Sequence, residues 1–175
     1  ISEVVVIKTK DMTLIAVLVS ILVVAQFAFS FVVGVQLVFP LLIIFTYNLG
    51  YKKAFIINLV FILLRFLMGL PFLTVFLWFW TFNILIALAH FVNKSTKSNE
   101  YIAAGFTLFY FVLFGFLCGV QNYFITEVPI YVYWLQGLVP DLLGGITGFI
   151  ATLVLLKPLS SVILHFYYEG SPSLS

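Results

Sequence analysis

The sequence predicts an all-α integral membrane protein with six transmembrane helices and both termini in the cytoplasm. Hydrophobic residues make up 64% of the 175 residues, and charged residues only 8%. A soluble domain holds about 45–50% apolar and about 25% charged residues, so this composition cannot form a water-facing surface. Long apolar runs such as Leu14 to Val24 lack the ten-residue alternation of a membrane β-barrel, so the predicted spans are helical.

Glycine, proline and charged residues divide the chain into six apolar segments. Each is treated as one span, because about 20 apolar residues cross a hydrocarbon core about 30 Å thick. The first three end at Gly34, Gly50 and Pro71; the next ends at the hydrophilic stretch 93–100 and the last at Lys157. The predicted spans are about 12–33, 35–50, 54–70, 72–92, 101–124 and 131–156, within a single transmembrane domain that covers residues 1–175.

Three segments depart from the pattern of plain apolar spans: the first apolar run, the second segment with its proline, and the C-terminal residues. The apolar run after the charged stretch 1–11 is too long for a signal peptide and lacks a small-residue cleavage pattern, so it is taken as the first span. Pro40 lies inside the short second segment and predicts a kink or a partly unwound helix there. Residues 169–175 are rich in Ser and Pro and are expected to form a frayed tail.

The distribution of lysines supports the count of six spans and gives the orientation. Cytoplasmic loops carry an excess of Lys and Arg. Six alternating spans put every lysine on one side, whereas the loops around Gly34, around Pro71 and over 122–130 hold neither Lys nor Arg. Five or seven spans would break this segregation, so both termini are predicted to be cytoplasmic. The lysines on that side are Lys8, Lys10, Lys52, Lys53, Lys94, Lys97 and Lys157.

Two ionisable side chains lie inside the predicted spans. Such a residue costs roughly 2.5–3.5 kcal/mol on insertion scales and needs a partner or a water-filled cavity. Arg65 lies about 8 Å from the outer end of the third span, close enough to extend to the interface. Asp141 lies deeper, after Pro140, where it could form a buried ion pair with Arg65, cap the helix that restarts there, or anchor a ligand.

Aromatic and amide side chains gather in the last three spans and toward their outer ends. One interpretation is an interfacial aromatic belt with wet loop residues. The other is a site for a small planar ligand, which needs aromatic walls and a few convergent amides. Gly144 and Gly148 form a Gly-x-x-x-Gly pair, which is typical of helix packing. The candidate ligand-binding residues are Gln36, Trp78, Asn83, Gln121, Asn122, Tyr131, Trp134, Gln136 and Asp141.

The sequence lacks the residue sets of an enzyme or a metal centre. His90 and His165 lie at predicted cytoplasmic ends, and Cys118 has no His or acid near it in sequence. No Walker A, His-Glu-x-x-His or Gly-x-Ser-x-Gly motif occurs, so neither a catalytic set nor a cofactor is predicted. The net charge of +2 is dispersed, which excludes a nucleic-acid stripe. The two halves show no internal repeat of the kind that ion-driven transporters commonly have.

Local stretches at the span ends carry a family resemblance. Ala16 and Ser20 also place small residues at i, i+4 spacing in the first span. The stretches are Gly34-Val35-Gln36-Leu37, Leu49-Gly50-Tyr51-Lys52-Lys53 and Leu155-Leu156-Lys157-Pro158-Leu159. Together with the size, the six spans and the order of loops, these features resemble the substrate-binding S components of bacterial energy-coupling factor vitamin transporters, over nearly the whole chain.

The resemblance implies a protein of the bacterial cell membrane that binds a vitamin or precursor from outside. It would associate with a transmembrane coupling subunit and two ATPase subunits, and topple in the membrane to release its load. ATP hydrolysis would belong to those partners. Ala16 and Ser20 match the family's Ala-x-x-x-Ala docking element, with Ser in place of the second Ala. The ligand would lie near the outer face among the last three spans, covered by the loop after the first.

The resemblance leaves the substrate open. The chain looks most like family members assigned to hydroxymethylpyrimidine or pyridoxine-like rings, with folate, pantothenate and thiamine as alternatives. The few available charges suit a neutral ring better than a dianion. Two other classes of function remain: a structural subunit of a larger membrane complex, and an intramembrane enzyme using Asp141, which has no second acid beside it.

Overall fold

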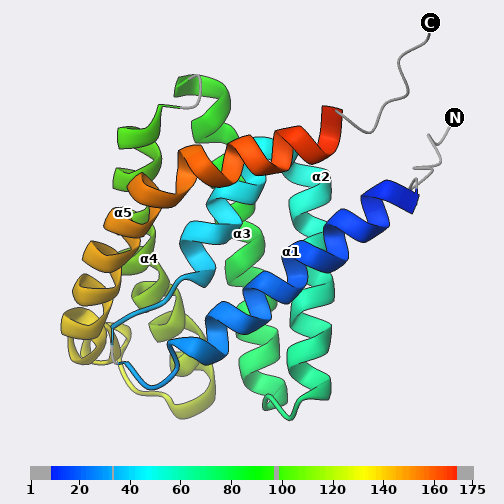
Figure 1. Cartoon of the computed structure of the whole chain (residues 1–175). Helices are drawn as coiled ribbons and strands as arrows, with labels where there is room; N and C mark the ends of the chain where they lie inside the picture. Colours follow the sequence, from blue (N-terminus) through cyan, green and yellow to red (C-terminus); the bar gives the residue numbers. More distant parts are fainter. Residues whose placement is uncertain (1–8, 33, 97–98, 169–175) are drawn as a thin grey trace, which may run out of the picture.

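The chain forms a bundle of helices. The computed structural model describes residues 9–32, 34–96 and 99–168, and over this part of the chain every regular element is a helix, which confirms the all-α prediction. The predicted frayed tail, 169–175, lies outside the described residues. The five helices, drawn in Figure 1, are α1 (Thr9–Ala28), α2 (Val38–Leu67), α3 (Phe72–Thr96), α4 (Glu100–Thr126) and α5 (Ile130–Tyr168).

Four of these helices have the length and composition of membrane spans. The qualifying stretches are Asp11–Ala28, Phe72–Thr96, Glu100–Thr126 and Ile130–Phe166. Large apolar side chains also point outward: Phe31 is 92% exposed and Phe124 81%. A water-soluble surface rarely carries contiguous apolar area on this scale. The helices and their outer surface are therefore those of an integral membrane protein.

Helix α2 is interrupted at Gly50. The backbone there has φ +75° and ψ 175°, outside the helical region. A β-carbon at Gly50 would meet no atom within 4 Å, so the positive φ, rather than space, favours glycine. Figure 1 shows that the chain turns back at this point, so that the two halves of α2 run in opposite directions. The break falls at the boundary expected between the second and third spans.

The kink expected at Pro40 does not form. Helix α2 begins at Val38, three residues later than the expected span, and Pro40 lies in its first turn. The first four N–H groups of a helix have no intrahelical acceptor, so a proline there removes no hydrogen bond. Residues 38–49 span only about 18 Å at 1.5 Å per residue, which is shorter than a hydrocarbon core.

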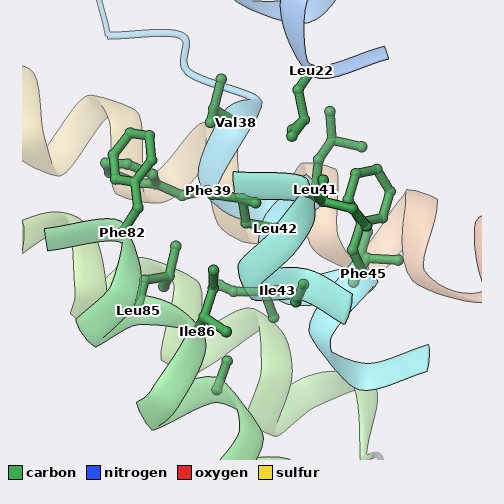
Figure 2. Packing of buried hydrophobic residues seen from close by; sticks show 14 of the residues in the cluster. Leu22, Val38, Phe39, Leu41, Leu42, Ile43, Phe45, Phe82, Leu85 and Ile86 are labelled. Carbon is green, nitrogen blue, oxygen red and sulfur yellow. The ribbon is translucent and has the colours of Figure 1, made fainter. Parts of the chain in front are cut away.

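The first half of α2 lies in the centre of the bundle. Nine consecutive residues, 38–46, are buried, and a helix that is apolar and buried all round belongs in an interior. Figure 2 labels six of these side chains, among them Phe39 and Leu42, and shows them beside Phe82, Leu85 and Ile86 of α3 and Leu22 of α1. Phe39 also lies 4.7 Å from the ring of Phe111 in α4, centroid to centroid. The central half-helix therefore joins α1, α3 and α4 in one core.

The sequence predicts that the last span ends at Lys157 and Pro158, but helix α5 continues past both residues. It continues to Tyr168 and contains 39 residues, with Pro140 and Pro158 inside it. A straight helix of this length would reach about 58 Å, nearly twice the thickness of a hydrocarbon core. Figure 1 shows that its last part turns aside and crosses one end of the bundle. Interior prolines remove a backbone hydrogen bond and permit such bends.

Ion pairs close one end of the bundle. Lys53 Nζ lies 2.9 Å from Asp11 Oδ1, which joins α2 to α1, and Lys157 Nζ lies 2.9 Å from Glu100 Oε2, which joins α5 to α4. Helix α1 begins and α5 ends on this side of the bundle in Figure 1. The connections 68–71 and 127–129 lie at the opposite end. The lysines among the described residues are therefore segregated in space as well as in sequence.

Candidate functional site

A pocket of about 350 Å³ opens between α4 and α5. It lies in the half of these helices that is nearer to their 127–129 connection. Small-molecule sites in proteins commonly measure about 300–1,000 Å³, so the pocket admits one ring with short substituents. The lining residues are Phe114, Gly115 and Cys118 of α4 and Tyr133, Gln136, Gly137 and Asp141 of α5.

The Asp141 carboxylate lies against the backbone of α4. A β-carbon at Gly115 would overlap Oδ2 of Asp141 and lie 3.0 Å from its Cγ. On α5, a β-carbon at Gly137 would lie 3.5 Å from the same oxygen, which is an ordinary contact. Oδ2 is buried and has no hydrogen-bond partner among the described residues. Gly115 therefore supplies the space that the carboxylate occupies.

The ion pair considered between Arg65 and Asp141 is absent from the structure. The guanidinium carbon of Arg65 lies 4.5 Å from the ring centroid of Phe27 in α1 and 5.8 Å from that of Trp78 in α3. These cation–π contacts hold the cation between α1 and α3. Asp141 instead faces Gly115 on α4. Neither charge has an ionic partner within the described ranges, so the structure does not contain this alternative.

Gln136 is the other predicted residue that lines the pocket, and Trp134 lies next to the pocket residue Gly115. The Trp134 Nε1–H donates to the carbonyl oxygen of Val112 over 3.2 Å, and the indole meets Phe116 edge-on at 6.4 Å. Its Cδ1 would lie 3.5 Å from a β-carbon at Gly115. The indole is therefore held beside Gly115, the same glycine that receives the Asp141 carboxylate, although Trp134 is not among the residues that line the pocket.

Three other predicted residues take part in packing between helices. Asn83 accepts a hydrogen bond from Asn58 Nδ2 at 3.3 Å, within the contact between α3 and α2. Gln121 Oε1 accepts from Trp80 Nε1 at 3.0 Å, within the contact between α4 and α3. Trp78 stacks on Phe61 of α2 with ring centroids 6.1 Å apart. These amides and this indole are occupied by neighbouring helices and do not line the pocket.

The remaining predicted ligand residues lie away from the pocket. Gln36 is exposed in the connection between α1 and α2, Asn122 is half-buried near the end of α4, and Tyr131 is 65% exposed near the start of α5. The α1–α2 connection does reach α5, because Thr147 Oγ1 donates to the carbonyl oxygen of Gly34 over 2.9 Å. This contact lies less than two turns along α5 from Asp141.

Sequence reasoning left five lining residues out of the candidate set. A signal for their location was available, since Gly115 and Gly119 form a Gly-x-x-x-Gly pair on α4, and such pairs allow a close approach by a neighbouring helix. A β-carbon at Gly119 would lie 3.0 Å from the carbonyl oxygen of Ile130. The omitted residues are Phe114, Gly115, Cys118, Tyr133 and Gly137.

The predicted docking residues lie on the outer surface of α1. Ala16 and Ser20 are exposed, and the Ser20 hydroxyl donates to the carbonyl oxygen of Ala16 over 2.8 Å. The opposite side of the helix, with Leu18, Val19 and Leu22, is buried in the bundle. Because the hydroxyl is bonded within the helix, this face presents a small and largely apolar surface.

No protein-family model, curated protein or solved structure matches the chain. A second pocket, of about 300 Å³, lies at the lysine end, but its acid, Glu100, already bonds to Lys157. Of these two pockets, only the α4–α5 pocket contains a buried polar atom without a hydrogen-bond partner among the described residues, which is Oδ2 of Asp141.

Proposed function

We propose that this chain is the substrate-binding subunit of an energy-coupling factor importer in the bacterial cell membrane. It captures a B vitamin or a precursor from outside and delivers it through an ATP-driven coupling module formed by other subunits. The α4–α5 pocket carries the proposal, because it combines ligand-sized volume, aromatic rings and one unpaired buried carboxylate oxygen. A hydroxymethylpyrimidine or pyridoxine-like ring is the preferred ligand, with folate, pantothenate and thiamine as alternatives.

Six membrane segments follow if the two halves of α2 are counted separately on either side of Gly50. Such a count places the start of α1, the turn at Gly50, the end of α3, the start of α4 and the end of α5 on one side. The ion pairs of Lys53 and Lys157 belong to this side, and cytoplasmic loops are rich in lysine. The α4–α5 pocket would then open toward the outside.

This topology predicts a difference in chemical labelling. With Cys118 replaced by alanine, a cysteine at Val128 in the 127–129 connection is expected to react with a membrane-impermeant maleimide on intact cells. A cysteine at Ser95 is expected to react only after the cells are opened. Labelling of the Ser95 variant on intact cells, with protection of the Val128 variant, would reverse the orientation and contradict the proposal.

Binding to the detergent-purified chain tests the function itself. Titration with a panel of B vitamins and pyrimidines is expected to find submicromolar affinity for one member. Trp134→Ala should weaken that affinity by about tenfold, or about 1.4 kcal/mol, because the indole packs beside Gly115 and supports the α4 wall of the pocket. Asn83→Ala is the matched control, since Asn83 bonds to Asn58 instead. A chain that binds no member is better described as a structural subunit of a membrane complex.

The exposed face of α1 predicts where a coupling subunit docks. Ala16→Leu is expected to abolish copurification with a transmembrane coupling subunit and two ATPase subunits, because close helix packing needs small residues at the contact. Ala87→Leu makes the same change at an exposed position of α3 and should leave the complex intact. Copurification that survives Ala16→Leu would show that α1 docks elsewhere or not at all.

A further inference from the structure

We infer that the α4–α5 pocket selects ligands that present a cationic nitrogen, or two adjacent N–H donors, to Asp141. It would reject ligands that bring a carboxylate to the same place. The inference rests on the proposed function and narrows the chemical class of its ligand.

The first argument is the unmatched charge of the site. None of the seven lining residues is basic, and Oδ2 of Asp141 is buried without a partner. The described basic side chains near acids are used elsewhere, since Lys53 pairs with Asp11 and Lys157 with Glu100. A buried charged oxygen that lacks a partner is strongly unfavourable. A cationic ligand would supply the missing partner.

The second argument is the shape of the acceptor. Gly115 leaves room for Oδ2 against the backbone of α4, where this oxygen is buried, and Gly137 adds no side chain on the α5 side. A carboxylate can accept two parallel N–H bonds, as it does from a guanidinium. An amino group beside a protonated ring nitrogen presents the same pair of donors. A ligand with a carbonyl group in place of the amino group would present an acceptor to the Asp141 carboxylate. The hydrogen bond from the amino group would then be lost.

The third argument is the rigidity of the aromatic walls. Phe114 packs against Phe39 with ring centroids 4.9 Å apart, so it is part of the central core. Trp134 is held by its bond to Val112 and its edge contact with Phe116. Fixed rings beside one carboxylate favour a flat ligand, and the faces of aromatic rings also attract cations. Tyr133 and Gln136 can hydrogen-bond to polar substituents on the edge of the ligand ring.

The alternative substrates differ in the groups that they can present to Asp141. Pantothenate carries a carboxylate, for which the lining residues offer no basic side chain and Asp141 offers repulsion. Folate carries carboxylates at one end, but its pterin ring has an amino group beside a ring N–H and so meets the donor requirement. Amino-substituted pyrimidines, pyridine amines and thiamine carry the required donors or a cationic ring. The earlier preference for a neutral ring therefore changes to a preference for a ring with donors or positive charge.

Matched pairs of probes test the inference on the full chain in detergent. The first pair is 4-amino-5-hydroxymethyl-2-methylpyrimidine and its 4-oxo counterpart; the second is pyridoxamine and 4-pyridoxic acid. We expect the nitrogen-bearing member of at least one pair to bind about tenfold more tightly or better, which corresponds to about 1.4 kcal/mol. Asp141→Asn should reduce that preference to less than about threefold, while Asp141→Glu should keep its direction.

The outcomes separate this inference from the proposed function. If the chain binds a panel member but prefers the oxo or carboxylate probe, or if Asp141→Asn keeps the full preference, the inference fails and the proposed function stands. If no panel member binds, both fail. The melting temperature of unliganded Asp141→Asn shows that the variant is folded, and Asp141→Glu provides a second variant if it is not.

Discussion

Replacing Gly148 by alanine is expected to force α4 and α5 apart and to lower the stability of the bundle by about 1–3 kcal/mol. A β-carbon there would lie 2.6 Å from Cε2 of Phe111 and 3.0 Å from Cγ2 of Thr107. At Gly144, one turn earlier, a β-carbon would lie 2.6 Å from Cε1 of the same ring. The ring thus lies across both glycines. It cannot withdraw, because its other side packs against Phe39 at 4.7 Å.

Thermal unfolding of the purified variants measures this effect. Gly105→Ala is the matched control on α4, because a β-carbon at Gly105 meets no atom within 4 Å. Alanine favours a helix over glycine by about 1 kcal/mol, so the control should be neutral or stabilising. Adding Phe111→Leu to Gly148→Ala should recover part of the loss, since neighbouring changes couple. Equal melting temperatures for Gly148→Ala and the wild type would refute the packing described here.

Replacing Gly115 by alanine is expected to displace the Asp141 carboxylate and weaken ligand binding by about tenfold or more. The new methyl group would overlap Oδ2, so the aspartate must leave its present rotamer or α5 must move. An off-rotamer side chain alone costs about 0.5–1.5 kcal/mol, and the carboxylate would also no longer face the pocket. The loss arises although Gly115 itself has no side chain to contact a ligand.

Gly137→Ala is the control on the opposite wall, where a β-carbon would make an ordinary 3.5 Å contact with Oδ2. Its affinity is expected to stay within about threefold of the wild type, a change of about 0.6 kcal/mol. A second readout needs no ligand. Gly115→Ala should lower the melting temperature in the wild type but not in an Asp141→Ala background, where the overlapping oxygen is gone. An equal loss in both backgrounds would show that the clash lies elsewhere.

Some predictions failed where the outcome depended on the position of a helix end. Pro40 was expected to kink a span, but α2 starts at Val38, so the proline falls in a first turn that needs no N–H acceptor. Lys157 and Pro158 were expected to close a span, but α5 bends and continues to Tyr168. Proline and lysine can therefore mark the end of a helix in one place and lie inside a helix in another. Their effect depends on where the helix begins and on what its end packs against.

The sequence by itself determined the all-α class, the approximate limits of the apolar segments, the break at Gly50 and the gathering of lysines at one end. These properties depend on composition and on neighbours a few residues apart, which are visible in a linear chain. The tertiary structure alone decided that Asn83 turns to Asn58, that Arg65 lies over Phe27, and that Asp141 faces Gly115. Each partner lies at least 25 residues away in sequence, so the angle and register at which the helices pack select it.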